Sequence, residues 1–150
     1  MFRFIALAWD RQVPACATAA AGLVASLRHQ EGWQCALSRS GLHVAVTGTR
    51  PGNNEASLLH GGQGVVLGRL FLRAQPGDAP AGAIALDAAA SEEILRSGGR
   101  TLIERYWGRY VALLDMGADD VRVLRDPGGA LPCHVLRHEG IDIVFSWLED

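Results

Sequence analysis

Lysine is absent from this sequence, and its 14 strongly basic side chains are all arginines. Aspartate and glutamate together number 16, which leaves a net charge of -2 at pH 7. Domains that bind nucleic acid or anionic membranes usually carry a clear excess of positive charge. The near balance of charges therefore argues against both nucleic acid and a membrane surface as partners.

Cysteines are few and far apart. Cys16, Cys35 and Cys133 form no Cys-x-x-Cys pair. An odd number without metal or redox spacing is typical of reduced thiols inside the cell. We therefore expect a cytoplasmic protein without a metal site, with Cys35 and Cys133 in its core.

Long hydrophobic runs are also missing. The apolar segment 2–9 is followed by Asp10 and Arg11, and the alanine-rich segment 14–27 ends at Arg28. A membrane-spanning helix needs about 20 strongly apolar residues, so neither segment is expected to be a span or a signal peptide. The 150 residues, 49% hydrophobic and 20% charged, suit one globular domain over residues 1–150.

Hydrophobic periodicity and turn residues predict an α+β fold. Strands are expected at 2–9, 33–38, 42–47, 65–72, 109–115, 121–125, 133–136 and 141–145. Helices are expected at 14–28, 91–95 and 102–106, with mostly loop at 48–64 and 74–82. Pro14 suits a first helical turn, Ser91 and Thr101 suit N-caps, and Gly41 suits a tight turn between two strands. We expect strands flanked by two helical layers.

Three parts of the sequence stand out by their order and spacing. They are Gly64–Phe71, the pair Ser91–Leu95 and Leu102–Gly108, and the pair Tyr110–Asp115 and Val123–Pro132. Together they resemble the N-terminal glutaminase domain of asparagine synthetase-like proteins, and the Arg-Asp-x-x-Gly-x-x-Pro pattern of the last is the most specific. The resemblance implies a four-layer αββα sandwich of the N-terminal-nucleophile (class II glutamine amidotransferase) type.

The residues that carry glutaminase chemistry in that family are replaced here. The family's nucleophile is an N-terminal cysteine, and this chain has Phe2 there. Its Asn-Gly oxyanion pair falls on Leu67 and Gly68, and the carboxylate that holds the substrate ammonium falls on Ala90. A glutaminase needs all three functions. The resemblance therefore implies a domain without glutaminase activity and without a catalytic residue.

The segment Arg125–Pro132 has an explanation from its own residues. Asp126 can accept backbone amides within a turn, Gly128 or Gly129 permits a left-handed conformation, and Pro132 precedes a strand where no ladder donor is needed. We favour a strand-to-strand corner for Arg125 and Asp126 over a direct ligand role.

Two other groups of residues give weaker indications of function. Ser97-Gly98-Gly99 is similar to part of a synthetase pyrophosphate loop, but it follows a predicted helix, whereas the phosphate cradle needs a strand before it. We interpret it as a loop between helices and find no ATP site. The five histidines show no metal-ligand spacing and are expected to be at the surface or partly buried.

Within the family, the missing nucleophile most resembles lasso peptide cyclases, which close an Asp or Glu side chain onto a peptide's own N-terminal amine. The resemblance implies a structural and docking role beside an ATP-binding synthetase domain, where ATP and magnesium would bind, with peptide substrate and other biosynthetic proteins as further partners. Trp147, in the segment 145–150, and Arg125, Asp126, Gly129 and Pro132 are the expected interface residues. Self-association through exposed apolar surface is a further expectation.

Three alternatives remain open. A β-lactam synthetase-like enzyme follows the same logic. A stand-alone binding or scaffold protein would reuse the sandwich. An enzyme with a relocated site would use a residue such as Cys16, although a lone thiol without a base is a weak nucleophile.

Overall fold

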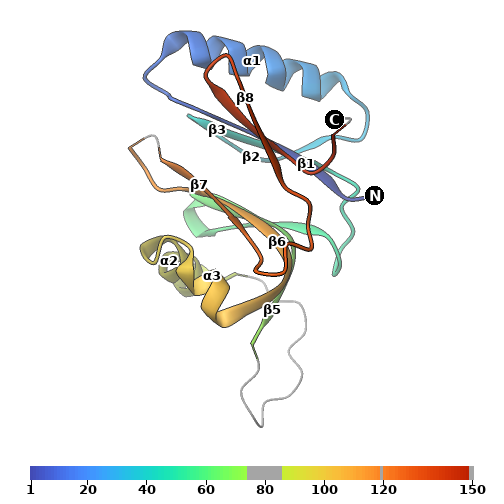
Figure 1. Ribbon diagram of the computed structural model, residues 1–150, viewed down its shortest axis with the longest axis vertical. Helices are drawn as coiled ribbons and strands as arrows, with labels where there is room; N and C mark the ends of the chain where they lie inside the picture. The colour runs from blue at the N-terminus through green and yellow to red at the C-terminus, as the bar shows by residue number, and fades with distance from the viewer. Residues whose placement is uncertain (74–85, 119, 149–150) are drawn as a thin grey trace.

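The computed structural model describes residues 1–73, 86–118 and 120–148. Two antiparallel sheets lie face to face in the middle of the protein (Figure 1). The first sheet has the order β2-β3-β1-β9-β8, with β1 at Arg3–Trp9, β2 at Gln34–Arg39, β3 at Leu42–Thr47, β8 at His134–His138 and β9 at Ile141–Phe145. The second has the order β4-β5-β6-β7, with β4 at Glu55–Leu58, β5 at Gly64–Leu72, β6 at Tyr106–Asp115 and β7 at Val121–Arg125.

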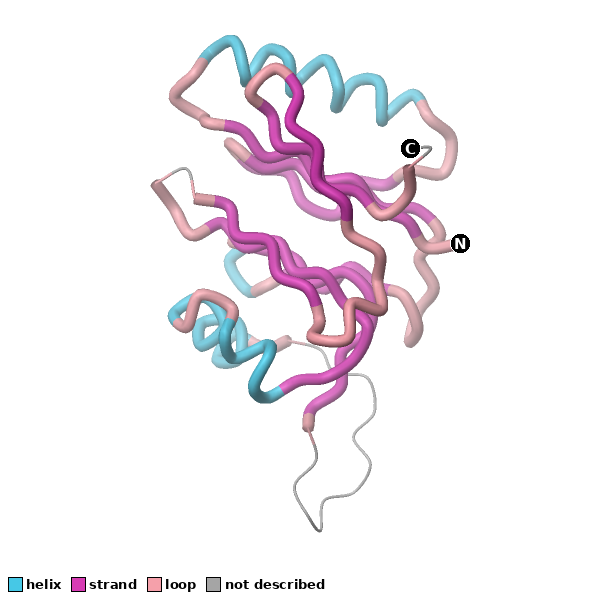
Figure 2. Tube along the Cα trace, in the orientation of Figure 1, coloured by secondary structure: helices cyan, strands magenta, loops and turns pink. Residues whose placement is uncertain are grey.

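Helices cover the two outer faces of this pair of sheets (Figure 2). Helix α1, Pro14–His29, lies on the first sheet, and α2, Ala88–Arg96, lies with α3, Arg100–Arg105, on the second. A short 3-10 helix, η1, spans His60–Gly62. The protein is therefore a mixed α+β fold of antiparallel sheets and three α-helices over the described ranges. No helix there has the length and hydrophobicity that crossing a bilayer requires.

Alternation along the strands builds three hydrophobic clusters. In β1, Phe4 faces the second sheet, whereas Ile5 and Leu7 face α1. In β5, Leu67 faces the first sheet and Val66 faces α2 and α3. Because side chains alternate between faces, each central strand contributes to two cores. The prediction of a first strand buried on both faces is confirmed.

Several boundaries agree with the sequence prediction and others do not. Helix α1, strands β2, β3, β5, β7 and β9, and the turn at Gly41, where φ is +83°, lie where they were expected. The prediction of mostly loop at 48–64 missed β4 and η1. Strand β4 has no apolar alternation and exists because its backbone pairs with the edge of β5. The loop expected at 74–82 lies outside the described residues.

Both predicted helix caps were wrong. Asp87 caps α2, because its Oδ1 accepts a hydrogen bond of 2.8 Å from the amide of Ala90. Ser91 is instead buried inside the helix, where its hydroxyl accepts from the amide of His60. Helix α3 begins after Gly99, and the hydroxyl of Ser97 accepts from both the amide and the hydroxyl of Thr101.

Three further expectations need correction. Cys35 is exposed on the edge strand β2 and is not part of the core. Residues 106–108 belong to β6 and not to the preceding helix or turn, because they pair with β5 as far as Leu72. Strand β8 likewise starts at His134 and runs to His138.

Candidate functional site

The position of the family nucleophile is filled by a core side chain. Phe2 is 5% exposed and packs between the two sheets, whereas Met1 is 78% exposed. The chain is held closely here, since a Cβ on Gly48 would lie 2.1 Å from the carbonyl oxygen of Met1. A nucleophile needs an accessible lone pair beside a base. A buried phenyl ring supplies neither.

Leu67 and Gly68 occupy adjacent positions in β5 but have different surroundings. Leu67 is fully buried in the same cluster as Phe2, so the structure brings these two positions together. Gly68 has φ +109°, and a Cβ there would lie 2.2 Å from the carbonyl oxygen of Arg109. Strand packing therefore explains the glycine without any oxyanion role.

The cavity that Gly68 lines holds only about 20 Å³, between β5 and the segment that carries Glu55. A single water needs about 10–15 Å³ on such a measure, so the space accommodates a water and not a glutamine. The cavity is on the face of β5 that carries Val66 and Leu70, whereas Phe2 and Leu67 face the other sheet. The pair Leu67 and Gly68 offers no side-chain hydrogen-bond donor.

Ala90 does not join these residues. It lies in the first turn of α2, on the outer layer of the second sheet, where its amide donates to Asp87. Phe2 and Leu67 lie between the sheets, on the other face of β5. The three positions expected from the resemblance are therefore split between two layers.

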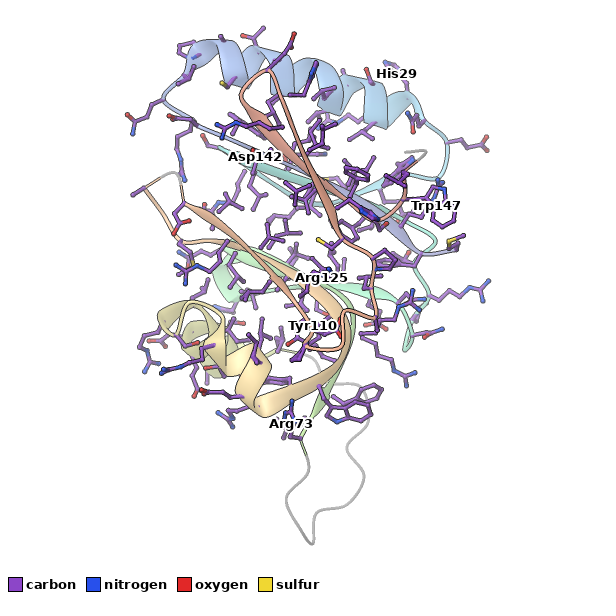
Figure 3. All side chains as sticks on the ribbon, in the orientation of Figure 1. His29, Arg73, Tyr110, Arg125, Asp142 and Trp147 are labelled. Atoms are coloured by element: carbon purple, nitrogen blue, oxygen red, sulfur yellow. The ribbon has the colours of Figure 1, made fainter. Side chains whose placement is uncertain are left out.

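The Arg125–Pro132 corner is organised by its own hydrogen bonds. Buried Asp126 accepts from the amide of Tyr110 at 3.3 Å and from the amide of Ala130 at 3.2 Å. Arg125 donates to the carbonyl oxygen of Gly129 at 3.1 Å, and Gly129 has φ +59°. The expected turn role of these residues is confirmed. Figure 3 shows Arg125 and Tyr110 close together where β6 and β7 pair.

Trp147 lies at a different place, beyond the end of β9 and near the chain ends (Figures 1 and 3). Its side chain is 39% exposed, and the neighbouring Leu148 is 77% exposed. Pro132 is also exposed, between the buried Leu131 and strand β8. The expected interface residues thus include exposed apolar groups and a corner whose polar groups are already paired.

Neither Cys16 nor Cys133 forms a hydrogen bond to a side-chain base within the described residues. The thiol of Cys16 lies 3.8 Å from the carbonyl oxygen of Glu139, which is not a base. Burial raises the pKa of the Cys133 thiol, against a smaller opposing effect of Arg125. Thiolate is the reactive form, so this shift makes Cys133 less nucleophilic at neutral pH.

An open cleft lies between the sheets at the far end of β1. It holds about 470 Å³, and its polar lining consists of Asp10, Asp120, Asp142 and Arg137. Among the described residues, its lining includes no serine, threonine, cysteine or histidine. The cleft therefore offers three carboxylates and one guanidinium group. Across the described ranges, no group of three or more His, Cys, Asp or Glu side chains is arranged to hold a metal ion.

Sequence reasoning missed a buried charge cluster that joins the sheets. Asp115, at the end of β6, is buried and lies 2.8 Å from Nε of Arg39 and 3.3 Å from a guanidinium nitrogen of Arg11. The two arginines come from β2 and from the loop after β1. These residues are more than 70 positions apart from Asp115, and no local pattern predicts that they meet.

The comparisons with known proteins add no relative. No model of a protein family, no curated protein and no solved structure matches this chain. The functional proposal therefore rests on the sequence resemblance and on the geometry described above.

Proposed function

We propose that this protein is a non-catalytic, glutaminase-like domain of the N-terminal-nucleophile type. It works beside the ATP-binding synthetase unit of an asparagine synthetase-like, amide-forming enzyme, most closely a lasso peptide macrolactam cyclase. One observation carries the proposal. Phe2 and Leu67 both fill the core between the sheets, where that family would need a nucleophile and an oxyanion donor.

The chemistry of ring closure gives a reason for such a loss. A macrolactam cyclase joins an activated side-chain carboxyl to the N-terminal amine of its own peptide, so ammonia from glutamine has no use. A domain of this kind keeps its folded core and provides a docking surface for the synthetase unit. ATP and magnesium belong to the synthetase unit in this proposal.

Trp147 and Leu148 are the groups we assign to docking, because they are apolar and exposed next to each other. Large aromatic side chains contribute strongly to protein interfaces when a partner buries them. Arg125 contributes less in this account, since its guanidinium already bonds Gly129.

The test is a binding measurement between this chain and an ATP-binding synthetase unit from the same genome, with peptide cyclisation followed in parallel. We expect Trp147→Ala to weaken binding at least about tenfold, or about 1.4 kcal/mol. Trp107→Ala is the matched control, because Trp107 is 52% exposed on a different element, β6. If the two proteins do not bind, and the synthetase unit cyclises its peptide at full rate alone, the docking role is wrong.

A further inference from the structure

A groove runs between α1 and the strands β2 and β3, on the outer face of the first sheet. It holds about 540 Å³, which is within the range of about 300 to 1,000 Å³ for small-molecule sites. One wall is a stripe of α1 in which Ala17, Ala21 and Ala25 recur every fourth residue. Their short side chains leave the space open, and Trp9 from β1 adds an aromatic surface.

All the ionisable side chains that line this groove are basic. They are Arg28 and His29 from α1, Arg39 from β2 and His43 from β3. Asp115 already neutralises Arg39 from the inner side of the sheet. Arg28 forms no hydrogen bond or ion pair within the described part of the chain. Cations are also favoured at the C-terminal end of a helix by its dipole, which accounts for Arg28 and His29 but not for His43.

His43 is the second, independent feature of the groove. Its side chain is 2% exposed, and Nδ1 lies 3.2 Å from the hydroxyl oxygen of Ser38. Burial, and then the charge of Arg28, lower the pKa of His43, so the ring is neutral at pH 7. When Nδ1 accepts from the hydroxyl of Ser38, the ring proton is on Nε2 and is available to an acceptor in the groove.

We propose that this groove binds a small organic anion, a carboxylate or a phosphate group carried on an apolar body. The anionic group lies between Arg28 and His43, and the apolar body lies along the alanine stripe toward Trp9. The groove and the core between the sheets lie on opposite faces of the first sheet. The inference therefore stands or falls independently of the glutaminase-like assignment.

The test is a set of titrations followed by amide chemical shifts in α1 and β3. Hexanoate and phenyl phosphate represent the two anionic groups, and hexylamine and hexanol carry an apolar body without an anion. We expect saturable binding of at least one anion, with hexanol at least about tenfold weaker, a loss of about 1.4 kcal/mol. Equal shifts with hexylamine would show apolar contact alone and overturn the proposal.

Two variants locate the site. Arg28→Gln is expected to weaken anion binding at least about fivefold, whereas Arg96→Gln, an exposed arginine of α2 outside the groove, leaves it unchanged. Arg28 is exposed, so its replacement leaves the core intact. Anion affinity within twofold of the parent chain in Arg28→Gln overturns the proposal.

The pH dependence of anion affinity is a further test of the site. A bound anion favours the charged form of His43, so binding takes up a proton, and affinity for hexanoate rises as the pH is lowered below 7. The titratable and charged side chains that share the groove with His43 are Arg28 and His29 of α1 and the Asp115-paired Arg39 of β2. We expect the rise in affinity to disappear in His43→Gln but to persist in His29→Gln. An unchanged pH profile in His43→Gln contradicts the assigned role of this ring.

Discussion

Asp126 shows how one buried carboxylate organises a turn. It accepts the amides of Tyr110 and Ala130 from two sides of the corner between β7 and β8. Its turn role was predictable, because the spacing of Asp126, Gly129 and Pro132 is local. Its link to Tyr110 was not, because that contact depends on the pairing of β6 with β7.

Replacing Asp126 by alanine leaves both amides without their acceptor. An unsatisfied buried donor costs about 1–3 kcal/mol, and we predict a loss of about 2–4 kcal/mol in the free energy of unfolding. Urea denaturation measures it. Glu104→Ala, at an exposed i,i+4 pair with Arg100, is the control and should change stability by less than about 0.5 kcal/mol. Equal losses in the two variants would contradict the account of the corner.

The environment of Tyr110 predicts how the stability of the protein changes at alkaline pH. Burial, with a smaller contribution from Asp126, raises the pKa of Tyr110 to about 12, and its hydroxyl donates to the carbonyl oxygen of Leu102. An unfolded tyrosine has a pKa of about 10. Since the folded pKa is the higher one, its contribution to stability is complete below about pH 10 and is lost as the pH rises toward about 12, by about 1.4 kcal/mol per pH unit.

We therefore expect the free energy of unfolding to fall less in Tyr110→Phe than in the parent chain between about pH 9.5 and 11.5. Below that range, the variant should be less stable by about 1 kcal/mol because it lacks the hydrogen bond. Urea denaturation over a pH series measures both slopes. Parallel curves for the two chains would show that Tyr110 does not titrate with folding.

Helices and strands were predicted well where the segment's own residues show a periodic pattern. They were predicted poorly where contacts with another segment determine the structure. The apolar spacing of α1 and the alternation of β9 are visible in their own residues. Strand β4, the cap at Asp87 and the hydrogen bond from Thr101 to Ser97 depend on pairing or on side-chain geometry that the sequence shows only ambiguously. Among the candidate site positions, Phe2 and Leu67 share the core between the sheets, whereas Ala90 lies in α2 on the outer layer.

Two glycines differ in whether contacts with another strand exclude a side chain. We predict that Gly68→Ala costs about 3 kcal/mol or more, because its φ is +109° and its Cβ would collide with the backbone of β6. Gly22→Ala in the exposed part of α1 meets nothing within 4 Å and should raise stability by about 0.5–1 kcal/mol. Thermal unfolding of both variants tests the pair, and opposite signs are the expected result.

For the whole molecule, the two sheets are joined by packing and by the Asp115 cluster. The α+β class was predictable from the order of strands and helices, whereas the stacking of two sheets followed only from the family resemblance. Contacts between the sheets were not predictable, because they join residues far apart in the chain. The same limit explains why the groove under α1 had no counterpart in the sequence patterns.

Removing the charge of Asp115 tests how the sheets are held together. Asp115→Asn leaves Arg39 and Arg11 without their carboxylate partner at the sheet junction. Breaking a fully buried pair costs about 3–5 kcal/mol, and because both guanidinium groups are about a third exposed we expect about 2 kcal/mol. Glu92→Gln, which breaks an exposed pair with Arg96, is the control and should be nearly neutral. A neutral result for Asp115→Asn in urea denaturation would contradict the prediction.

The central claim is that this domain lacks glutaminase chemistry, and glutamine hydrolysis tests it most directly. We predict that glutamate release by the chain begun at residue 2 does not exceed that of its Phe2→Ala variant. Phe2→Cys should remain inactive, because Leu67 supplies no side-chain oxyanion donor and Ala90 supplies no carboxylate for the substrate ammonium. Hydrolysis by the parent chain above the Phe2→Ala level, or full activity restored by Phe2→Cys alone, would contradict the account.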